Sequence, residues 1–154
     1  MKKRVLMVCL GNICRSPMAE AILRHKIQKL NINAEVDSCG FEAFHIGDSP
    51  DPRAQETLLK HGIPVGNIRS RLFKTSDFDN FDYIYVMDAN NFADVSLMAR
   101  NAADMQKVDF IRNIVHPRKN MEVSDPYYGG QEGFEKVFNE LDEATEKICS
   151  ILQA

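Results

Sequence analysis

A cysteine and an arginine lie six positions apart near the start of the chain, and a serine follows the arginine directly. The stretch is Val8-Cys9-Leu10-Gly11-Asn12-Ile13-Cys14-Arg15-Ser16-Pro17. An apolar run ends at Cys9 and a helical pattern begins at Pro17, so the residues between them form a loop that enters a helix. The backbone N–H groups of such a loop and the helix dipole attract anions. Because the guanidinium of Arg15 suits two oxygens of a phosphate, the stretch predicts an anion-binding loop around a thiol.

This loop gives the thiol of Cys9 a chemical role. A helix N-terminus and a neighbouring cation favour the thiolate, which is the nucleophilic form of cysteine. Donors that hold a thiolate also hold the equatorial oxygens of a phosphoryl group, so nucleophile and electrophile would share one site. We expect Gly11 to take a backbone conformation that is closed to other residues. The candidate phosphate-binding residues are Leu10, Gly11, Asn12, Ile13, Cys14, Arg15 and Ser16.

A late Asp-Pro pair supplies a candidate proton donor. Asp125 lies on a predicted loop and is followed by Pro126, Tyr127 and Tyr128. Displacing an aryl oxide from phosphorus requires a proton on the leaving oxygen. Burial or the negative charge of a substrate helps a carboxyl group to keep its proton near neutral pH. An Asp-Pro pair is also common in ordinary turns, so Asp125 is a catalytic candidate because it occurs together with the loop at Cys9.

The chain resembles the low-molecular-weight protein tyrosine phosphatases in three motifs that occur in the family's order. They are the stretch 8–17, Asp51-Pro52-Arg53 and Asp125-Pro126-Tyr127-Tyr128, and with 154 residues the resemblance covers essentially the whole chain. The resemblance implies hydrolysis of phosphotyrosine monoesters through a phosphocysteine intermediate, without a metal or a cofactor. Cys9 would be the nucleophile, Arg15 and the loop amides would bind phosphate, and Asp125 would be the general acid and base. The expected partner is a tyrosine-phosphorylated protein or a small aryl phosphate.

The resemblance also implies roles for residues around the loop. Asn12 would hold the shape of the loop, and Ser38 would support Asn12. Ser16 would hydrogen-bond the sulfur of Cys9 and help it to leave. The family has an acidic residue facing the loop at the position of Asp88, although Asp88 could equally be only a helix cap. The expected walls and supports of the pocket are Phe41, Phe44, Tyr127, Tyr128 and an Asp51–Arg53 salt bridge.

One wall residue departs from the family. Many members have a small Thr or Ser at the position of Phe41, so the shape of this wall, and with it the substrate preference, stays open. Either Phe41 or Phe44 could instead be ordinary packing. Arg69 and Arg71 are weaker candidates for a basic surface near the site.

Two other functions stay open at this point. Arsenate reductases share this fold and the Cys-x5-Arg loop, but they need further cysteines to pass electrons on. Cys39 and Cys149 form no close pair in sequence. A non-catalytic phosphate-binding module would be marked by the loss of Cys9 or Asp125, and both are present. Cys14, inside the loop, is expected to protect an oxidised Cys9 by forming a disulfide with it.

Four predicted strands and the helices between them must position these residues. The strands are 3–10, 34–38, 81–87 and 108–111, and the helices are 17–31 with an N-cap at Ser16, 52–61 with an N-cap at Asp51, one starting near Ala89, and 133–152. Strands alternating with helices predict an α/β fold with a doubly wound, four-stranded parallel sheet and helices on both faces. This architecture is flavodoxin-like, or phosphotyrosine phosphatase I-like. Ligands bind at the carboxyl edge of such a sheet, where Cys9 and Asp88 lie.

Composition limits the class of partner. A chain with 44% hydrophobic and 27% charged residues is of ordinary globular type and is expected to form a single domain over 1–154. The net charge of −3 indicates neither a nucleic-acid partner nor binding to an anionic membrane. The longest apolar runs are too short for a membrane span or a secretory signal. We therefore expect a cytoplasmic monomer with reduced cysteines.

Overall fold

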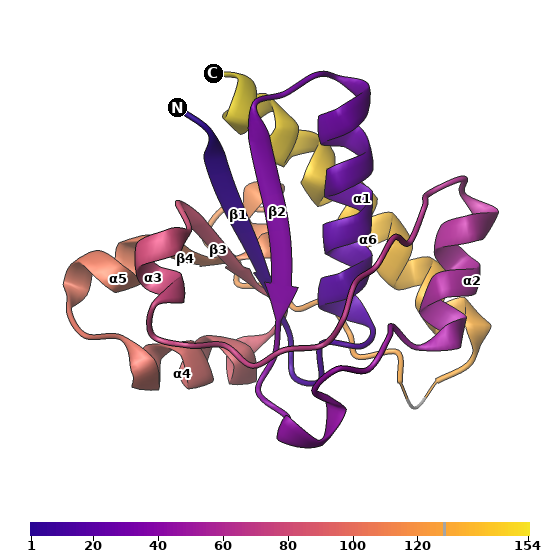
Figure 1. The fold of residues 1–154 in the computed structure, drawn as a ribbon, viewed down its shortest axis with the longest axis horizontal. Coiled ribbons are helices and arrows are strands. Elements are labelled where there is room, and N and C mark those ends of the chain that lie inside the picture. The colour runs from indigo at the N-terminus through magenta and orange to yellow at the C-terminus, as the bar shows by residue number, and fades with distance from the viewer. Residues whose placement is uncertain (128) are drawn as a thin grey trace.

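Strand β1 lies inside the sheet and leads directly into the candidate loop. The computed structural model describes residues 1–127 and 129–154, and its four parallel strands follow the order β2-β1-β3-β4 (Figure 1). They are β1 Lys3–Val8, β2 Ala34–Cys39, β3 Tyr83–Val86 and β4 Val108–Phe110. The predicted doubly wound sheet is confirmed. β1 is shorter than predicted because the chain leaves the sheet after Val8 to form the loop.

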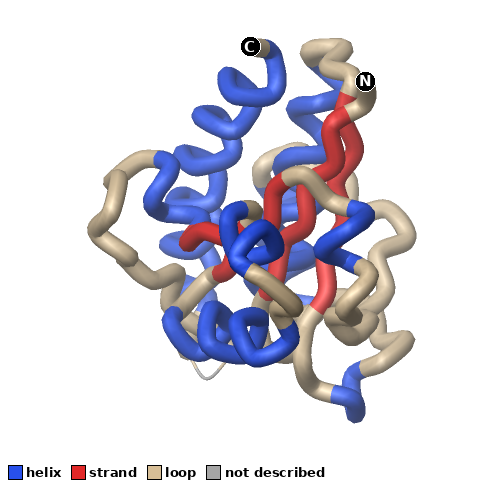
Figure 2. The backbone as a smooth tube through the Cα atoms, turned by 90° about the vertical axis from the view of Figure 1, so that its left-hand side faces the viewer, coloured by secondary structure: helices blue, strands red, loops and turns tan. Residues whose placement is uncertain are grey.

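Both faces of the sheet are buried. Side chains of successive residues in a strand point to opposite faces, so neighbouring residues of β1 enter different apolar clusters. Val5 and Met7 belong to one apolar cluster, and Leu6 and Val8 belong to the other. Residues of α1, α2 and α6 pack in the first cluster, and residues of α3, α4 and α5 pack in the second. The helices are α1 Arg15–Lys29, α2 Pro52–Lys60, α3 Asp77–Asn80, α4 Ala89–Met98, α5 Ala102–Gln106 and α6 Gln131–Gln153. Figure 2 shows the strands between these helices.

The first two long helices begin in different ways. Asp51 caps α2 by accepting a hydrogen bond from the N–H of Arg53, and Gly62, just after the helix, has a φ of +73°. The cap at Asp51 was expected, and a glycine with positive φ just after a helix is a common way for a helix to end. The prediction that Ser16 caps α1 is wrong, since the helix already begins at Arg15 and its cap position is Cys14. The hydroxyl of Ser16 is used instead in the hydrogen-bond network beneath the loop.

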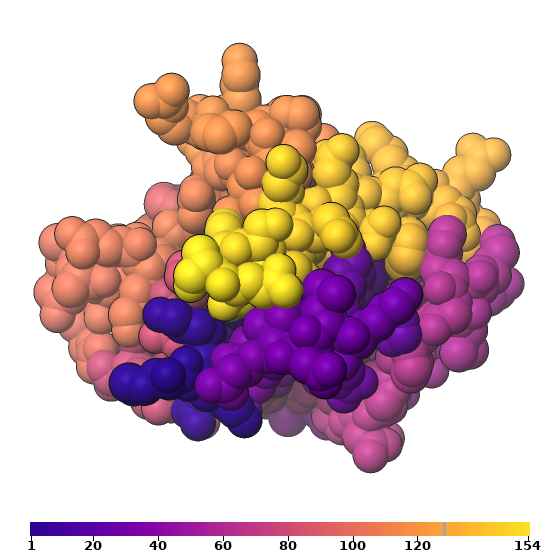
Figure 3. Space-filling view, turned by 90° about the horizontal axis from the view of Figure 1, so that it is seen from above, coloured from indigo at the N-terminus to yellow at the C-terminus, as the bar shows by residue number. Residues whose placement is uncertain are grey.

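The last helix closes the first face of the sheet. α6 packs along α1, and the C-terminal end of α6 lies beside the end of α1 on the face seen in Figure 3. Its buried side chains include Phe134, Val137, Phe138, Leu141 and Ile148, as the helical spacing predicts. Among the described residues, no helix has the length and apolar character needed to cross a membrane.

Candidate active site

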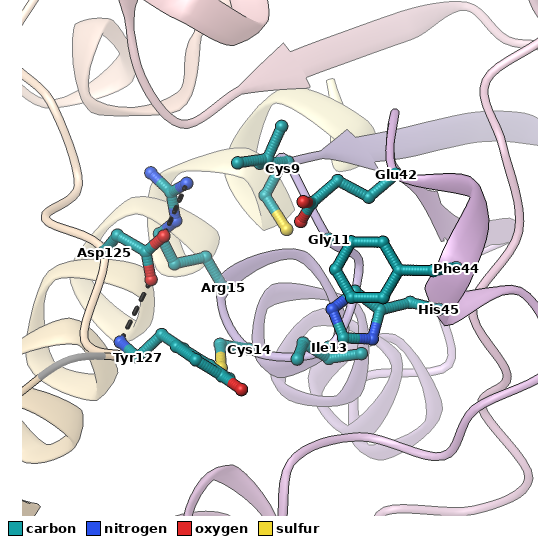
Figure 4. A pocket seen from close by; sticks show the side chains of 11 residues that line it. Cys9, Gly11, Ile13, Cys14, Arg15, Glu42, Phe44, His45, Asp125 and Tyr127 are labelled. Atoms are coloured by element: carbon teal, nitrogen blue, oxygen red, sulfur yellow. Dashed lines mark hydrogen bonds and ion pairs between the residues drawn. The ribbon is translucent and has the colours of Figure 1, made fainter.

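A pocket of about 150 Å³ lies at the carboxyl end of β1, next to the start of α1 (Figure 4). It is lined by Cys9, Leu10, Gly11, Ile13, Cys14, Arg15, Glu42, Phe44, His45, Asp125 and Tyr127. These residues come from the loop after β1, the loop after β2 and the loop before α6. The fold therefore brings the predicted nucleophile, arginine and proton donor into one cavity, although more than a hundred residues separate Cys9 from Asp125 in sequence.

The loop directs its backbone polar groups in opposite ways. Its carbonyl groups accept hydrogen bonds from outside: Leu10 O from Phe41 N at 2.7 Å, Gly11 O from Ser70 Oγ at 3.1 Å, and Ile13 O from Asp51 N at 2.8 Å. Within residues 1–127 and 129–154, the N–H groups of residues 10–14 donate to no acceptor of the protein. Free donors on consecutive residues at the entry to a helix form an anion-binding nest.

Asn12, rather than Gly11, takes the unusual backbone conformation of the loop. Asn12 has a φ of +56°, whereas Gly11 has no positive φ, so the expectation for Gly11 is wrong. The side chain of Asn12 offsets this strain with three hydrogen bonds: its Nδ2 donates to Ser16 Oγ at 2.8 Å and to Ser38 Oγ at 2.9 Å, and its Oδ1 accepts from Arg71 N at 3.0 Å.

The glycine at position 11 is needed for space instead. A Cβ on Gly11 would lie 3.1 Å from Glu42 Oε1 and 3.2 Å from His45 Cδ2. Gly40, at the end of β2, is more constrained still, because a Cβ there would lie only 2.6 Å from the carbonyl oxygen of Leu10. The loop after β2 can therefore approach the candidate loop closely because neither Gly11 nor Gly40 carries a side chain.

Cys9 is at one end of a chain of buried hydrogen bonds. Its sulfur lies 3.0 Å from Ser16 Oγ and 3.4 Å from Ser16 N, and the exposed fraction of the residue is 3%. Ser16 continues to Asn12 and Ser38, which are the contacts that the resemblance implies. Ser38 Oγ then donates to Glu20 Oε1 at 2.5 Å. Glu20 was not predicted from the sequence. The signal that could have identified it is a glutamate among the apolar residues of the helix, because a buried glutamate needs a partner.

Arg15 is buried and is held by groups from two other segments, the end of β3 and the loop before α6. Its Nη1 donates to Asp88 Oδ2 at 2.7 Å and to the carbonyl of Val123 at 2.9 Å, and its Nη2 lies 3.7 Å from Asp125 Oδ2. Burial opposes the charge of Arg15, but the negative groups Cys9, Asp88 and Asp125 outweigh it and raise the pKa of the guanidinium. Asp88 also caps α4 by accepting from Asn91 N, so its two expected roles coexist.

The loop that carries Asp125 is anchored on both sides of that residue. Val123 N donates to the carbonyl of Met87 at 2.8 Å, and the Nη2 of Arg53 donates to the carbonyl of Tyr127 at 2.9 Å. The Asp51–Arg53 ion pair is present at 3.0 Å, and these contacts connect it to the loop. Arg53 lowers the pKa of Asp51, although burial alone would raise it. Asp125 itself accepts from Tyr127 N at 3.0 Å.

The pocket walls differ from the expectation at several positions. Phe44 and Tyr127 line the pocket, whereas Phe41 is absent from the lining among the described residues, so its prediction as a wall is wrong. Phe41 stacks on Phe73 with ring centroids 5.6 Å apart, because its side chain packs against the second apolar cluster. Tyr128 lies outside the described residues.

Other charged groups are also placed differently from the expectation. Arg71 binds Asp37 and Asp77, and Arg69 donates to the carbonyl of Ile68, so in the described part of the chain neither contributes to the pocket lining. Glu42 and His45 do line the pocket and were missed. Their orientation depends on the short 3-10 turn 43–45, for which the sequence has no periodic signal.

Comparisons with known proteins agree with this geometry. The family model described as "Low molecular weight phosphotyrosine protein phosphatase" matches residues 4–154. A phosphatase of that name from Schizosaccharomyces pombe is 43% identical over 141 residues, which are 90% of this chain and 89% of the relative. The crystal structure of a protein tyrosine phosphatase from Entamoeba histolytica has a TM-score of 0.91 at 36% identity and covers 99% of this chain and 97% of its own.

A Drosophila arginine phosphatase has a similar structure. Its crystal structure has a TM-score of 0.89 at 34% identity, with coverage of 100% of this chain and 99% of its own. The similar structures therefore include one named a tyrosine phosphatase and one named an arginine phosphatase. One fold often serves several functions in this way. The match of the family model over residues 4–154, together with the S. pombe relative, shows that this chain belongs to the low molecular weight phosphotyrosine protein phosphatase family.

Proposed function

We propose that this chain hydrolyses phosphotyrosine monoesters through a phosphocysteine intermediate on Cys9. The observation that carries the proposal is the nest of free N–H groups over residues 10–14, which surrounds the Cys9 thiol beside the guanidinium of Arg15. A phosphoryl group in this nest would have its oxygens held by fixed donors, in a site where little reorganisation is needed. This arrangement supports the proposal, because phosphoryl transfer depends mainly on positioning and electrostatic stabilisation.

The first step forms the intermediate. The Cys9 thiolate attacks phosphorus in line with the departing tyrosine oxygen, so that an S–P bond forms as the P–O bond breaks. Arg15 and the loop amides stabilise the equatorial oxygens. Asp125, which lies 3.7 Å from the guanidinium of Arg15, gives its proton to the leaving oxygen.

The second step restores the enzyme. Asp125, now ionised, takes a proton from a water molecule that attacks phosphorus, and the S–P bond breaks to release inorganic phosphate. The hydroxyl of Ser16, 3.0 Å from the sulfur, stabilises the departing thiolate of Cys9. The side-chain network of Asn12 and Ser38 keeps the hydroxyl in place.

Aromatic walls support tyrosine as the phosphorylated residue. Ile13, Phe44 and Tyr127 offer apolar surface to a ring, and Cys9, which lines the same pocket, is only 3% exposed. A phosphoserine is shorter and would not carry its phosphate to the sulfur. An arsenate reductase would need a cysteine relay, and Cys39 and Cys149 are buried away from the described lining.

The proposed reaction is tested with a pair of peptides that differ only in phosphotyrosine against phosphoserine. We expect the reduced chain to release phosphate from the phosphotyrosine peptide at the same rate with and without EDTA, and to act on the phosphoserine peptide far more slowly. Absence of turnover by a folded, reduced chain would contradict the proposal. In that case arsenate reduction coupled to thioredoxin would be assayed next.

Cys14 is proposed to protect Cys9 from irreversible oxidation. Burial raises the pKa of the Cys14 thiol, and the negative charges of Asp51, Cys9 and Asp125 raise it further. Cys14 therefore stays protonated and does not compete with Cys9 as nucleophile. It could still capture a sulfenic acid on Cys9 as a disulfide, which a thiol reductant reverses.

We expect the Cys14→Ser variant to regain less activity than the parent when dithiothreitol follows a pulse of peroxide. The variant has no neighbouring thiol to stop oxidation of Cys9 at the reversible stage. Recovered phosphatase activity is the measurement, and Cys149→Ser, which changes a buried cysteine on α6, is the control. Full recovery of Cys14→Ser would show that Cys14 has no protective role.

We also infer a reducing, cytoplasmic setting and a monomer. All four cysteines are buried free thiols, and the proposed nucleophile works only while it is reduced. Each residue in the proposed reaction belongs to a single chain, so one copy is sufficient for catalysis.

A further inference from the structure

Among the acidic and basic side chains of the described pocket lining, Glu42 is the one that makes no hydrogen bond or ion pair. Asp125 accepts from Tyr127 N, and His45 Nδ1 lies 3.1 Å from Asp48 Oδ2. Within the described chain, the carboxylate of Glu42 makes neither a hydrogen bond nor an ion pair. The side chain is partly buried in the lining, and Figure 4 shows it on the side of the pocket opposite Asp125.

The backbone that carries this carboxylate is tied to the loop after β1. Glu42 N donates to the carbonyl of Leu10, which ties the residue to the phosphate-binding loop. The absence of a side chain on Gly11 makes room for Glu42 Oε1, which would lie 3.1 Å from a Cβ at that position. The carboxylate is therefore held at the edge of the loop that is proposed to receive a phosphate.

An unpaired negative charge beside a phosphate site disfavours any substrate that brings only negative charge. In the described pocket lining, Arg15 is the one arginine or lysine, and it already faces Asp88 and the proposed phosphate. The imidazole of His45 faces Asp48 and not Glu42. The chain thus supplies Glu42 with no compensating cation in its described part, and a substrate that supplies one gains an attraction instead of a repulsion.

We propose that Glu42 makes the enzyme prefer phosphotyrosine with a positively charged residue next to it in the substrate chain. The inference rests on the proposed function, since it concerns the substrate of the same pocket. A neighbouring Lys or Arg would extend along the wall formed by Glu42 and Phe44, a residue that is 74% exposed. The apolar stem of such a side chain can cover the ring while its charged end meets the carboxylate.

The size of the preference follows from the partial exposure of the site. Water and salt weaken ion pairs at such positions, so we expect a graded preference and not an absolute requirement. A Lys neighbour is expected to raise kcat/KM about threefold relative to Ala, and a Glu neighbour to lower it by a similar factor. The two effects together make the ratio of Lys to Glu substrates about tenfold.

The test uses phosphotyrosine peptides with Lys, Ala or Glu placed directly before or directly after the phosphotyrosine. The parent is compared with Glu42→Gln, which keeps the shape of the side chain, and with Glu42→Lys. Glu56→Gln is the matched control, because it removes the same charge from an exposed position on α2. The measured quantity is the ratio of kcat/KM for the Lys peptide to kcat/KM for the Glu peptide, taken separately for residues before and after the phosphotyrosine. In at least one of these two series, we expect the ratio to fall to about one in Glu42→Gln, to invert in Glu42→Lys, and to stay unchanged in Glu56→Gln.

The outcomes separate this inference from the proposed function. If the parent hydrolyses the Ala peptide but has the same Lys-to-Glu ratio as Glu42→Gln in both series, the role of Glu42 is wrong and the phosphatase reaction stands. An equal change in Glu56→Gln would assign the preference to the net charge of the molecule and also overturn the role. If the parent hydrolyses none of the peptides, the proposed function fails and the inference fails with it.

Discussion

Replacement of Cys9 by serine is expected to abolish the hydrolysis of phosphotyrosine peptides, with a loss of more than about 10⁴-fold in kcat. A serine hydroxyl at this site is not ionised near neutral pH, and within the described residues no carboxylate or imidazole hydrogen-bonds the sulfur. The nearest polar group is the hydroxyl of Ser16, 3.0 Å away, which is itself fixed by Asn12. Release of phosphate from a phosphotyrosine peptide measures the loss.

The Cys9→Ser variant should nevertheless bind inorganic phosphate as the parent does. The groups proposed to bind phosphate are Arg15 and the free N–H groups of residues 10–14, and the substitution alters neither. Cys149→Ser is the matched control, because it makes the same replacement at a buried cysteine on α6 and should keep full activity. Turnover by Cys9→Ser at a rate near that of the parent would exclude Cys9 as the nucleophile.

The sequence predicted those features of the site that depend on residues close together in the chain. Cys9 and Arg15 are separated by a single loop, and a strand followed by a helix is enough to bring both to one edge of the sheet. The Asp51 cap is equally local, because it depends on the next two residues. Burial of both faces of β1 follows from its continuous apolar run.

Contacts between distant segments needed either the family resemblance or the structure. Asp125 could be linked to Cys9 only by resemblance, since an Asp-Pro pair alone indicates a turn. The error at Phe41 has a physical cause: the sequence cannot tell which of two nearby aromatic side chains enters the pocket and which joins the apolar cluster. Glu42 was missed for the same reason, because a short 3-10 turn decides where it points.

The backbone of the loop shows a further limit of sequence reasoning. Glycine was the natural choice for an unusual φ, but Asn12 adopts φ +56° and its amide is satisfied by Ser16, Ser38 and the N–H of Arg71. Asn tolerates this region better than most residues. The stability of the conformation comes from partners that are distant in sequence, so no local pattern could have indicated it.

Replacement of Asp125 by alanine is expected to lower kcat for a phosphotyrosine peptide by about 10²-fold or more, which is the usual contribution of a positioned proton donor. The carboxylate lies 3.7 Å from Arg15 Nη2 at the pocket wall, while its other oxygen accepts from Tyr127 N. A phosphate ester whose leaving group departs without a proton, such as p-nitrophenyl phosphate, should lose much less. A comparison of kcat for the two substrates measures proton donation directly.

Asp125→Asn separates proton transfer from positioning. The asparagine side chain can still accept the hydrogen bond from Tyr127 N that orders the loop, and Arg53 still holds the carbonyl of Tyr127, but the amide has no acidic proton to give. If Asp125 acts as the general acid, Asp125→Asn should be as slow as Asp125→Ala on the peptide and should likewise be spared with p-nitrophenyl phosphate. An Asp125→Asn variant with the activity of the parent would instead mean that Asp125 only shapes the loop, and the proton would have to come from another group of the pocket.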